Sequence, residues 1–270
     1  MMMMMMSGRS AIGHISHPIG NDGVDPSKYH FVLVHGFGGG AWGWYKVRTL
    51  LEASGFKVTC LDLKASGINL SPLESVHSFD DYTQPLTHFF EHYSPTHSHE
   101  KVILVGHSAG GLNVTDATYK FANKIDVAVY VAATMLKHGF ATEQDIIDGM
   151  PEKLRPGSRP EPDAHNNSNQ KMKTRIPPED VVLGSMLHRP GPLKAILGAK
   201  FEGSDQAECV PRIYIRTLQD EALKPEQQEA MIRRWPPARV FALDTDHNPT
   251  VSAPFLLAGL LAKATHECFA

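Results

Sequence analysis

One serine of this chain stands at an abrupt change of sequence pattern. The apolar run KVILVGH at 101–107 predicts a buried strand, and residues 109–122 have helical spacing. The motif Gly106-His107-Ser108-Ala109-Gly110 joins the two segments, and a G-x-S-x-G motif in this context lifts its serine out of the sheet on a sharp turn. We predict that Ser108 is a nucleophile; a tight turn without chemistry is the alternative.

A serine hydroxyl is a poor nucleophile at neutral pH and needs a neighbouring base that a third group orients. His247 follows the last predicted strand and precedes the final predicted helix. Asp220 follows the strand before it, so the order along the chain is serine, acid, histidine. Asp244 and Asp246 are competing acids, but they stand too close in sequence to His247 to reach the far side of its ring easily. We therefore predict His247 as the base and Asp220 as the acid.

A glycine-rich loop, HGFGGGAWGWYK at 35–46, follows the first predicted strand. Such a loop leaves backbone N–H groups free, and we predict that the amides of Phe37 and Ala109 form an oxyanion hole. A plain turn and a phosphate-binding loop are the alternatives. Neither GxGxxG nor GxxxxGK(S/T) is present, which disfavours nucleotide binding.

Six short apolar runs alternate with segments of helical length. Because the runs are mostly continuous rather than alternating in polarity, they predict strands covered on both faces, as in a parallel sheet. The pattern indicates an α/β fold with a doubly wound, mostly parallel sheet of about six strands. The predicted strands are 30–36, 56–62, 101–107, 126–132, 211–217 and 238–244, and the predicted helices are 41–54, 79–93, 109–122, 226–234 and 254–266.

One domain is predicted for residues 29–270, after a flexible tail at 1–28 for which a transit segment is the alternative. The alternation of strands and helices fails between about 134 and 205. We expect this insertion to form a small cap over the carboxyl edge of the sheet, where such folds bind ligands. Its polar part at 151–178 predicts a loose loop, whereas two later segments have helical patterns, 181–189 and 192–201.

Composition restricts the expected partners. The 270 residues carry 26 basic and 29 acidic side chains, a net charge of −3, without a long basic run, so no nucleic-acid partner is expected. No window approaches the about 20 apolar residues that span a bilayer, so no membrane partner is expected. Three cysteines without CxxC spacing indicate neither a disulfide framework nor a zinc site. We expect a cytoplasmic protein with a small-molecule partner and no metal, as a monomer or a homodimer.

Several longer stretches resemble the plant methylesterase family of α/β-hydrolases, relatives of salicylate-binding esterase and hydroxynitrile lyase. The resemblance is closest to the branch that cleaves methyl indole-3-acetate. The matching stretches cover most of 30–145 and 211–262: HFVLVHGFGGGAWGWYK, CLDLKASGI, SFDDYTQPL, KVILVGHSAGGLNVTDA, MLKHG, YIRTLQD and KPEQQEAMIRRWPP. Lyase relatives usually carry Thr in place of Gly36 and Lys in place of Asn248. The absence of both favours an esterase.

The resemblance implies a serine carboxylesterase with the α/β-hydrolase fold, without a cofactor, that converts a small methyl ester to the free acid and methanol. The expected substrate contacts are Gly36, Phe37, His107 and Thr250, although the His107 side chain is expected to point away from the site. Two aromatic residues usual in the family after the base are replaced here by Thr250 and Val251, and the cap is polar, which predicts a poorly walled pocket. A receptor of this fold with little turnover, and a lyase-type enzyme on the same triad, are the alternatives.

Overall fold

A six-stranded parallel sheet forms the centre of the protein. The structure, a computed structural model, describes residues 25–94, 101–158 and 175–267. The strand order is β2-β1-β3-β4-β5-β6, and every neighbouring pair is parallel. The predicted α/β fold is therefore confirmed. The strands are β1 (Tyr29–Val34), β2 (Lys57–Leu61), β3 (Lys101–His107), β4 (Ile125–Val131), β5 (Arg212–Thr217) and β6 (Arg239–Leu243).

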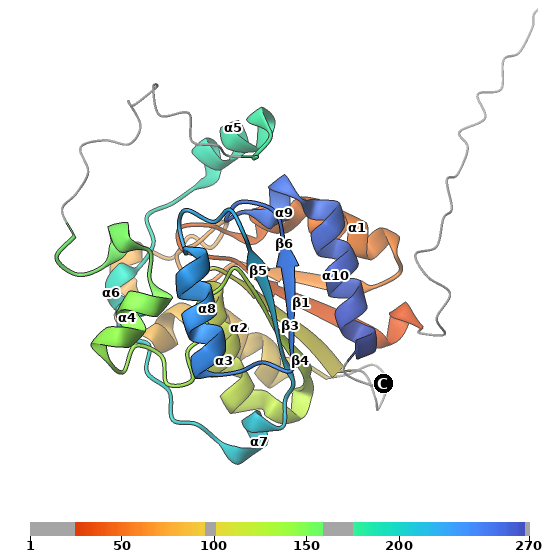
Figure 1. Cartoon of the computed structure of the whole chain (residues 1–270), viewed down its shortest axis with the longest axis horizontal. Coiled ribbons are helices and arrows are strands. Elements are labelled where there is room, and N and C mark those ends of the chain that lie inside the picture. Colours follow the sequence, from red (N-terminus) through yellow and green to blue (C-terminus); the bar gives the residue numbers. More distant parts are fainter. Residues whose placement is uncertain (1–24, 95–100, 159–174, 268–270) are drawn as a thin grey trace, which may run out of the picture.

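Helices cover both faces of this sheet, which explains the continuous apolar runs. Successive residues of a strand point to opposite faces. On β3, Ile103 packs with the helices of one face, whereas Leu104 packs with those of the other. Helices α1 (Tyr45–Ala53) and α10 (Pro254–Glu267) cover the first face, and α2 (Phe79–His92), α3 (Gly110–Phe121) and α8 (Pro225–Arg234) cover the second (Figure 1). The core is thus two apolar layers separated by the sheet.

The first predicted helix, 41–54, is divided in the structure. A 3₁₀ turn, η2 (Ala41–Trp44), precedes α1 and buries the indole of Trp44. The side chain of Asp62 accepts the N–H of Ala41 at 2.7 Å and so fixes the start of this turn. The glycine-rich loop is thereby held between β1 and α1.

The segment between β4 and β5 interrupts the alternation of strands and helices, as the sequence predicts. It contains α4 (Glu143–Gly149), the 3₁₀ turn η5 (Glu152–Leu154), α5 (Pro178–Leu187), α6 (Leu193–Leu197) and α7 (Asp205–Glu208). Figure 1 shows α4 and α6 to one side of the sheet and α5 above it. The middle of the predicted polar loop, residues 159–174, lies outside the described residues. The name cap denotes the described residues from 134 to 205.

The described part of the chain begins with a short 3₁₀ turn, η1 (Pro26–Lys28), which is capped by Asp25. This turn is the last part of the predicted tail, and residues 1–24 of that tail lie outside the described residues. Among the helices described, none is long and apolar enough to cross a membrane.

Candidate active site

Ser108 occupies a strained turn between β3 and α3. Its φ of 54° lies in the left-handed region, which a residue with a side chain rarely adopts. The flanking glycines make the turn possible. A Cβ on Gly106 would lie 2.6 Å from the carbonyl oxygen of Gly110, and a Cβ on Gly110 would lie 2.6 Å from that of His35. The motif therefore meets the steric demand of the turn, and Ser108 lines a pocket.

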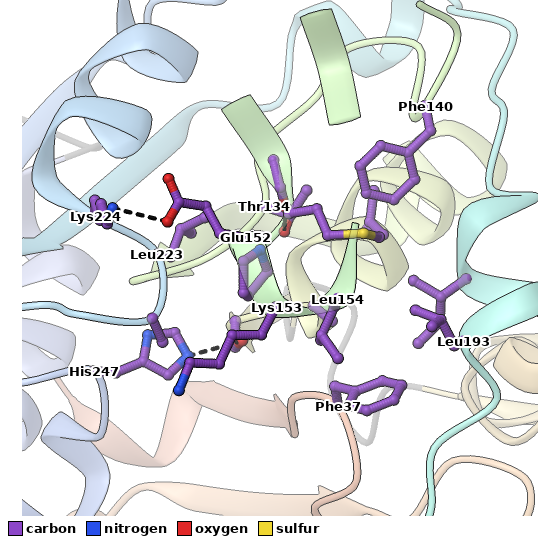
Figure 2. Close-up of a pocket in the computed structure, with 18 of the residues that line it drawn as sticks. Phe37, Thr134, Phe140, Glu152, Lys153, Leu154, Leu193, Leu223, Lys224 and His247 are labelled. Atoms are coloured by element: carbon purple, nitrogen blue, oxygen red, sulfur yellow. Dashed lines mark hydrogen bonds and ion pairs between the residues drawn. The ribbon is translucent and has the colours of Figure 1, made fainter. Parts of the chain in front are cut away.

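Ser108, His247 and Asp220 form a hydrogen-bonded chain, although each comes from a different loop. Nε2 of His247 lies 2.9 Å from Oγ of Ser108, and Nδ1 of His247 lies 2.8 Å from Oδ2 of Asp220. With an ionised Asp220, Nδ1–H donates to the carboxylate, and Nε2 is left to accept the serine proton. In Figure 2, the His247 ring lies at the edge of the pocket, with a dashed line marking its bond to the serine.

Asp220 is held from both sides. Oδ1 accepts the N–H groups of Ala222 at 2.9 Å and Leu223 at 2.8 Å, and Oδ2 accepts the hydroxyl of Thr217 at 2.8 Å. Burial alone disfavours the charged carboxylate, but the hydrogen bond and charge of His247, with the bonds from Leu223 and Thr217, outweigh it. The pKa of Asp220 consequently lies below its usual value. The acid is ionised at neutral pH.

The two competing acids are placed elsewhere. Asp244 is exposed and interacts with Arg175 and Gln219. Asp246 accepts the hydroxyl of Ser252 at 2.8 Å and so holds the turn that follows His247. Neither of them hydrogen-bonds the His247 ring, in agreement with the choice of Asp220.

Two backbone amides next to Ser108 are available to an oxyanion. The N–H groups of Phe37 and Ala109 donate to no other described residue, and both residues line the pocket with Ser108. Cap residues fix the loop that carries Phe37, because the carbonyl of Gly38 accepts the amide of Arg189 at 3.0 Å and Nδ1 of His188 also lies 3.0 Å from it. The two amides therefore lie beside the pocket without a described acceptor, and their role as an oxyanion hole stays a prediction.

The pocket beside these groups has a volume of about 830 Å³. Apolar side chains form most of its wall, and a pair of opposite charges, Lys224 and Glu152, lies 3.0 Å apart at its rim (Figure 2). Pocket residues from the cap, which the sequence analysis did not identify, are Thr134, Phe140, Gly149, Met150, Pro151, Glu152, Lys153, Leu154, Leu193 and Ile196. The described part of the cap therefore contributes to the pocket wall, while the expectation of a poorly walled pocket stays a prediction, because residues 159–174 lie outside the described residues. The signals for this wall in the sequence were the apolar residues scattered through 135–154 and the helical pattern at 192–201.

The predicted substrate contacts are only partly in the pocket. Phe37 lines it, whereas Gly36 lies behind Ser108, where an added Cβ would be 2.8 Å from the serine Cβ. Thr250 is buried in α9 (Pro249–Ser252) and is absent from the lining, so its small size does not open the acyl pocket.

His107 supports the base instead of contacting the pocket. Its Nε2–H donates to the backbone carbonyl of His247 at 2.7 Å, and its ring centroid lies 5.0 Å from that of His247. Burial, with the nearby His247 ring, lowers the pKa of His107 to about 4. His107 is therefore neutral at pH 7 and adds no charge beside the base.

Potential metal ligands lie away from this site. Among the residues described, only His88, Glu91 and His92 bring three ligand atoms close together, and all three are exposed at the end of α2. None of them lines the pocket. The reactive groups at the pocket are the hydroxyl of Ser108, the imidazole of His247 and the amides of Phe37 and Ala109.

A strained serine at a strand-to-helix turn, with a base and an acid from later loops of a parallel sheet, defines a serine hydrolase of α/β topology. The chain belongs to the α/β hydrolase family, whose model matches residues 31–260. With its Ser-His-Asp triad it is a carboxylic ester hydrolase.

Its similar proteins include plant methylesterases. Methylesterase 17 of Arabidopsis thaliana is 45% identical over 253 residues, which cover 87% of this chain and 91% of the relative. Pheophorbidase of Raphanus sativus is 39% identical over 258 residues, covering 91% and 97% of the two chains. The crystal structure of the methylesterase MES16 from Arabidopsis superposes with a TM-score of 0.74 at 37% identity, covering 88% of this chain and 98% of that one. The predicted resemblance to plant methylesterases is thus confirmed.

Proposed function

We propose that the protein hydrolyses a small methyl ester, methyl indole-3-acetate or a related ester of a plant hormone or aromatic acid, to the free acid and methanol. The observation that carries this proposal is the hydrogen-bonded chain from Ser108 through His247 to Asp220, beside two free backbone amides. The similarity to methylesterases supports the methyl ester, and the largely apolar pocket suits an aromatic acyl group.

In the first half-reaction, Oγ of Ser108 attacks the ester carbonyl while Nε2 of His247 takes its proton. The negative charge that develops on the carbonyl oxygen is stabilised by the N–H groups of Phe37 and Ala109. The bond to the methoxy oxygen then breaks, and the imidazolium of His247 protonates the departing methanol. An acyl group remains on Ser108.

In the second half-reaction, water replaces methanol. His247 removes a proton from the water, which attacks the acyl carbon, and the same two amides hold the charge. The bond between the acyl carbon and Oγ then breaks, the imidazolium of His247 returns its proton to Oγ of Ser108, and the free acid departs. Asp220 keeps the imidazole oriented and stabilises its charged form in both halves.

The position of Gly36 favours ester hydrolysis over lyase chemistry. A Cβ added to Gly36 would lie 2.8 Å from Cβ of Ser108 and 3.3 Å from its Oγ. The threonine that lyase relatives usually carry here would therefore displace Ser108 or the loop in this chain. A cytoplasmic setting is part of the proposal, and the free thiols of Cys60 and Cys209 support a reducing compartment.

The test is a panel of methyl esters, including those of indole-3-acetate, jasmonate and salicylate, assayed for methanol release. We expect the wild type to hydrolyse the indole ester with multiple turnovers. Ser108→Ala is expected to lower kcat on the order of 10⁵- to 10⁶-fold, because the nucleophile is lost. Tight binding of these esters without methanol release would instead support a receptor, and full activity of Ser108→Ala would exclude the proposed mechanism.

A further inference from the structure

Helix α8 lies between the loop of the triad acid and the cap. It follows the Asp220 loop directly and packs beside α4, as Figure 1 shows. Two neighbouring glutamines of this helix, Gln227 and Gln228, are 9% and 0% exposed. Buried amides need hydrogen-bond partners, so the partners of each glutamine indicate its role.

Gln228 binds the triad acid and the strand end before it. Its Oε1 accepts the N–H of Thr217 at 3.1 Å. Its Nε2 lies 2.7 Å from the carbonyl oxygen of Leu223, 3.0 Å from Oγ1 of Thr217 and 3.1 Å from Oδ2 of Asp220. The hydroxyl of Thr217 itself donates to the same Oδ2. Gln228 and Thr217 thus approach the very oxygen that binds the His247 ring.

This arrangement restricts rotation of the Asp220 carboxylate about its terminal side-chain torsion. The terminal torsion of an aspartate side chain is broad, so a single hydrogen bond leaves its carboxylate free to swing. The Ala222 and Leu223 amides hold Oδ1 of Asp220, and Thr217 with Gln228 holds Oδ2. The plane of the carboxylate is therefore set before His247 binds to it.

Gln227 has a different set of partners. Its Nε2 lies 2.7 Å from the carbonyl oxygen of Ile147 and 3.0 Å from that of Met150, both in the cap. Met150 lines the pocket. Arg234, at the other end of α8, reinforces this contact through ion pairs with Asp145 and Asp148 of α4. Oε1 of Gln227 accepts the N–H of Lys224 at 3.1 Å, at the start of α8. Among the described hydrogen bonds, Gln227 therefore holds the pocket wall and has none to Asp220.

We propose that these two adjacent glutamines are separate positioning residues, Gln228 for the carboxylate of Asp220 and Gln227 for the cap wall of the pocket. The inference rests on the ester hydrolysis proposed above. The proposal assigns an effect on kcat to Gln228 and an effect on KM to Gln227. The two residues are neighbours on one helix and are similarly buried.

The matched variants are Gln228→Met and Gln227→Met. Gln228→Met is expected to lower kcat about 10- to 100-fold with KM within about two-fold of wild type, because a misoriented acid weakens the base in the transition state. Gln227→Met is expected to raise KM about five- to ten-fold with kcat nearly unchanged, because the wall loses its anchor. Equal effects of both variants on kcat and KM would overturn the proposal.

A second pair of variants covers the case in which Gln228→Met does not fold. Thr217→Val removes the hydroxyl that donates to Oδ2 of Asp220, and Thr217→Ser keeps it. We expect a loss of kcat in Thr217→Val that Thr217→Ser largely restores. Where both single variants fold, the double variant is expected to lose less than the product of the two losses, because both act on one oxygen. Independent, multiplicative losses would overturn the shared role.

Reaction with a fluorophosphonate separates this inference from the choice of substrate. Ser108 attacks the phosphorus and fluoride leaves, so the rate reports the activation of the serine without a natural ester. We expect Gln228→Met to slow this inactivation about ten-fold or more and Gln227→Met to leave it within about two-fold. A wild type that reacts with the probe but hydrolyses no methyl ester would refute the proposed substrate alone. An unchanged rate in Gln228→Met would refute the role of Gln228.

Discussion

Asp220 illustrates how single residues define the site. Of the three candidate acids near the last predicted strands, each has donors on both carboxylate oxygens, but only Asp220 bonds the His247 ring. Asp244 is on the surface, and Asp246 holds the turn after His247. The order of residues along the chain indicated Asp220, but its network of donors became visible only in the fold.

Asp220→Asn is expected to lower kcat about 10³- to 10⁴-fold, because an amide in place of the carboxylate holds the imidazole in the wrong tautomer. KM for a methyl ester should change little, since Asp220 does not line the pocket. Asp244→Asn is the matched control and should retain wild-type kcat. Comparable losses in the two variants would contradict the assignment of the acid.

Gly36→Ala tests the space behind the nucleophile. The added Cβ would lie 2.8 Å from Cβ of Ser108, so the serine or the loop must shift, and we expect kcat/KM to fall about 10²-fold. Gly39→Ala, in the same loop, is the control, because its Cβ would meet no atom closer than 3.4 Å. Kinetics on a methyl ester measure both variants. A fully active Gly36→Ala would show that this space is not needed.

Among the elements of the cap, α5 and the residues after it contact α1 and the loop that carries Phe37. Its buried Asp180 accepts the hydroxyl of Tyr45 at 2.6 Å and forms an ion pair with Lys46, both on α1. His188 and Arg189, directly after α5, bind the carbonyl of Gly38. The tether at Asp180 therefore lies on the same connection that fixes the loop of Phe37.

Asp180→Ala is expected to reduce the free energy of unfolding by about 2–3 kcal/mol, because it leaves the partly buried Lys46 without its partner. Urea denaturation followed by circular dichroism measures this change. Glu179→Ala, the exposed neighbour on the same helix, should stay within about 0.5 kcal/mol of wild type. An equal, small effect of both would show that the tether does not stabilise the fold.

The elements that could be predicted from sequence are those with a strong pattern. All six strands were predicted because their apolar runs are short and mostly continuous, and the long helices because their spacing is regular. The edge strands β2 and β6 are nevertheless only partly buried. The short helices α4, α7 and α9 were missed. For α4 a signal existed, since Thr142 and Asp145 form a capping box at its start. Few residues in each of these helices contact the core, which leaves little periodicity to detect.

At the scale of the whole molecule, the site was predictable where it depends on chain order and not where it depends on packing. Ser108, His247 and Asp220 meet because the carboxyl ends of parallel strands share one edge. The pocket wall comes from the cap, whose path over the sheet no local pattern specifies. For the same reason Thr250, which was predicted as a substrate contact from its position after His247, is buried in α9 and does not line the pocket.

The burial of His107 predicts a pH dependence of overall stability. Its pKa is lowered from 6.5 to about 4 in the folded protein, so between these values the unfolded chain binds more protons than the folded one. Stability is therefore lost as the pH falls from 6.5 to about 4, by up to about 3 kcal/mol from this group. Urea unfolding at a series of pH values measures the slope. His107→Gln should flatten it, whereas His77→Gln, on the surface, should not; the same slope in His107→Gln would contradict this origin.

The measurement that tests the central claim most directly is the location of the acyl group during turnover. The protein is mixed with the p-nitrophenyl ester of a hindered aromatic acid, quenched in acid within the first turnover, and its peptides are analysed by mass spectrometry. We expect the acyl mass on Ser108 in the wild type and on no residue in Ser108→Ala. Hydrolysis of the ester with Ser108 unmodified at every time point, or an acyl group on a different residue, would contradict a serine esterase built on this triad.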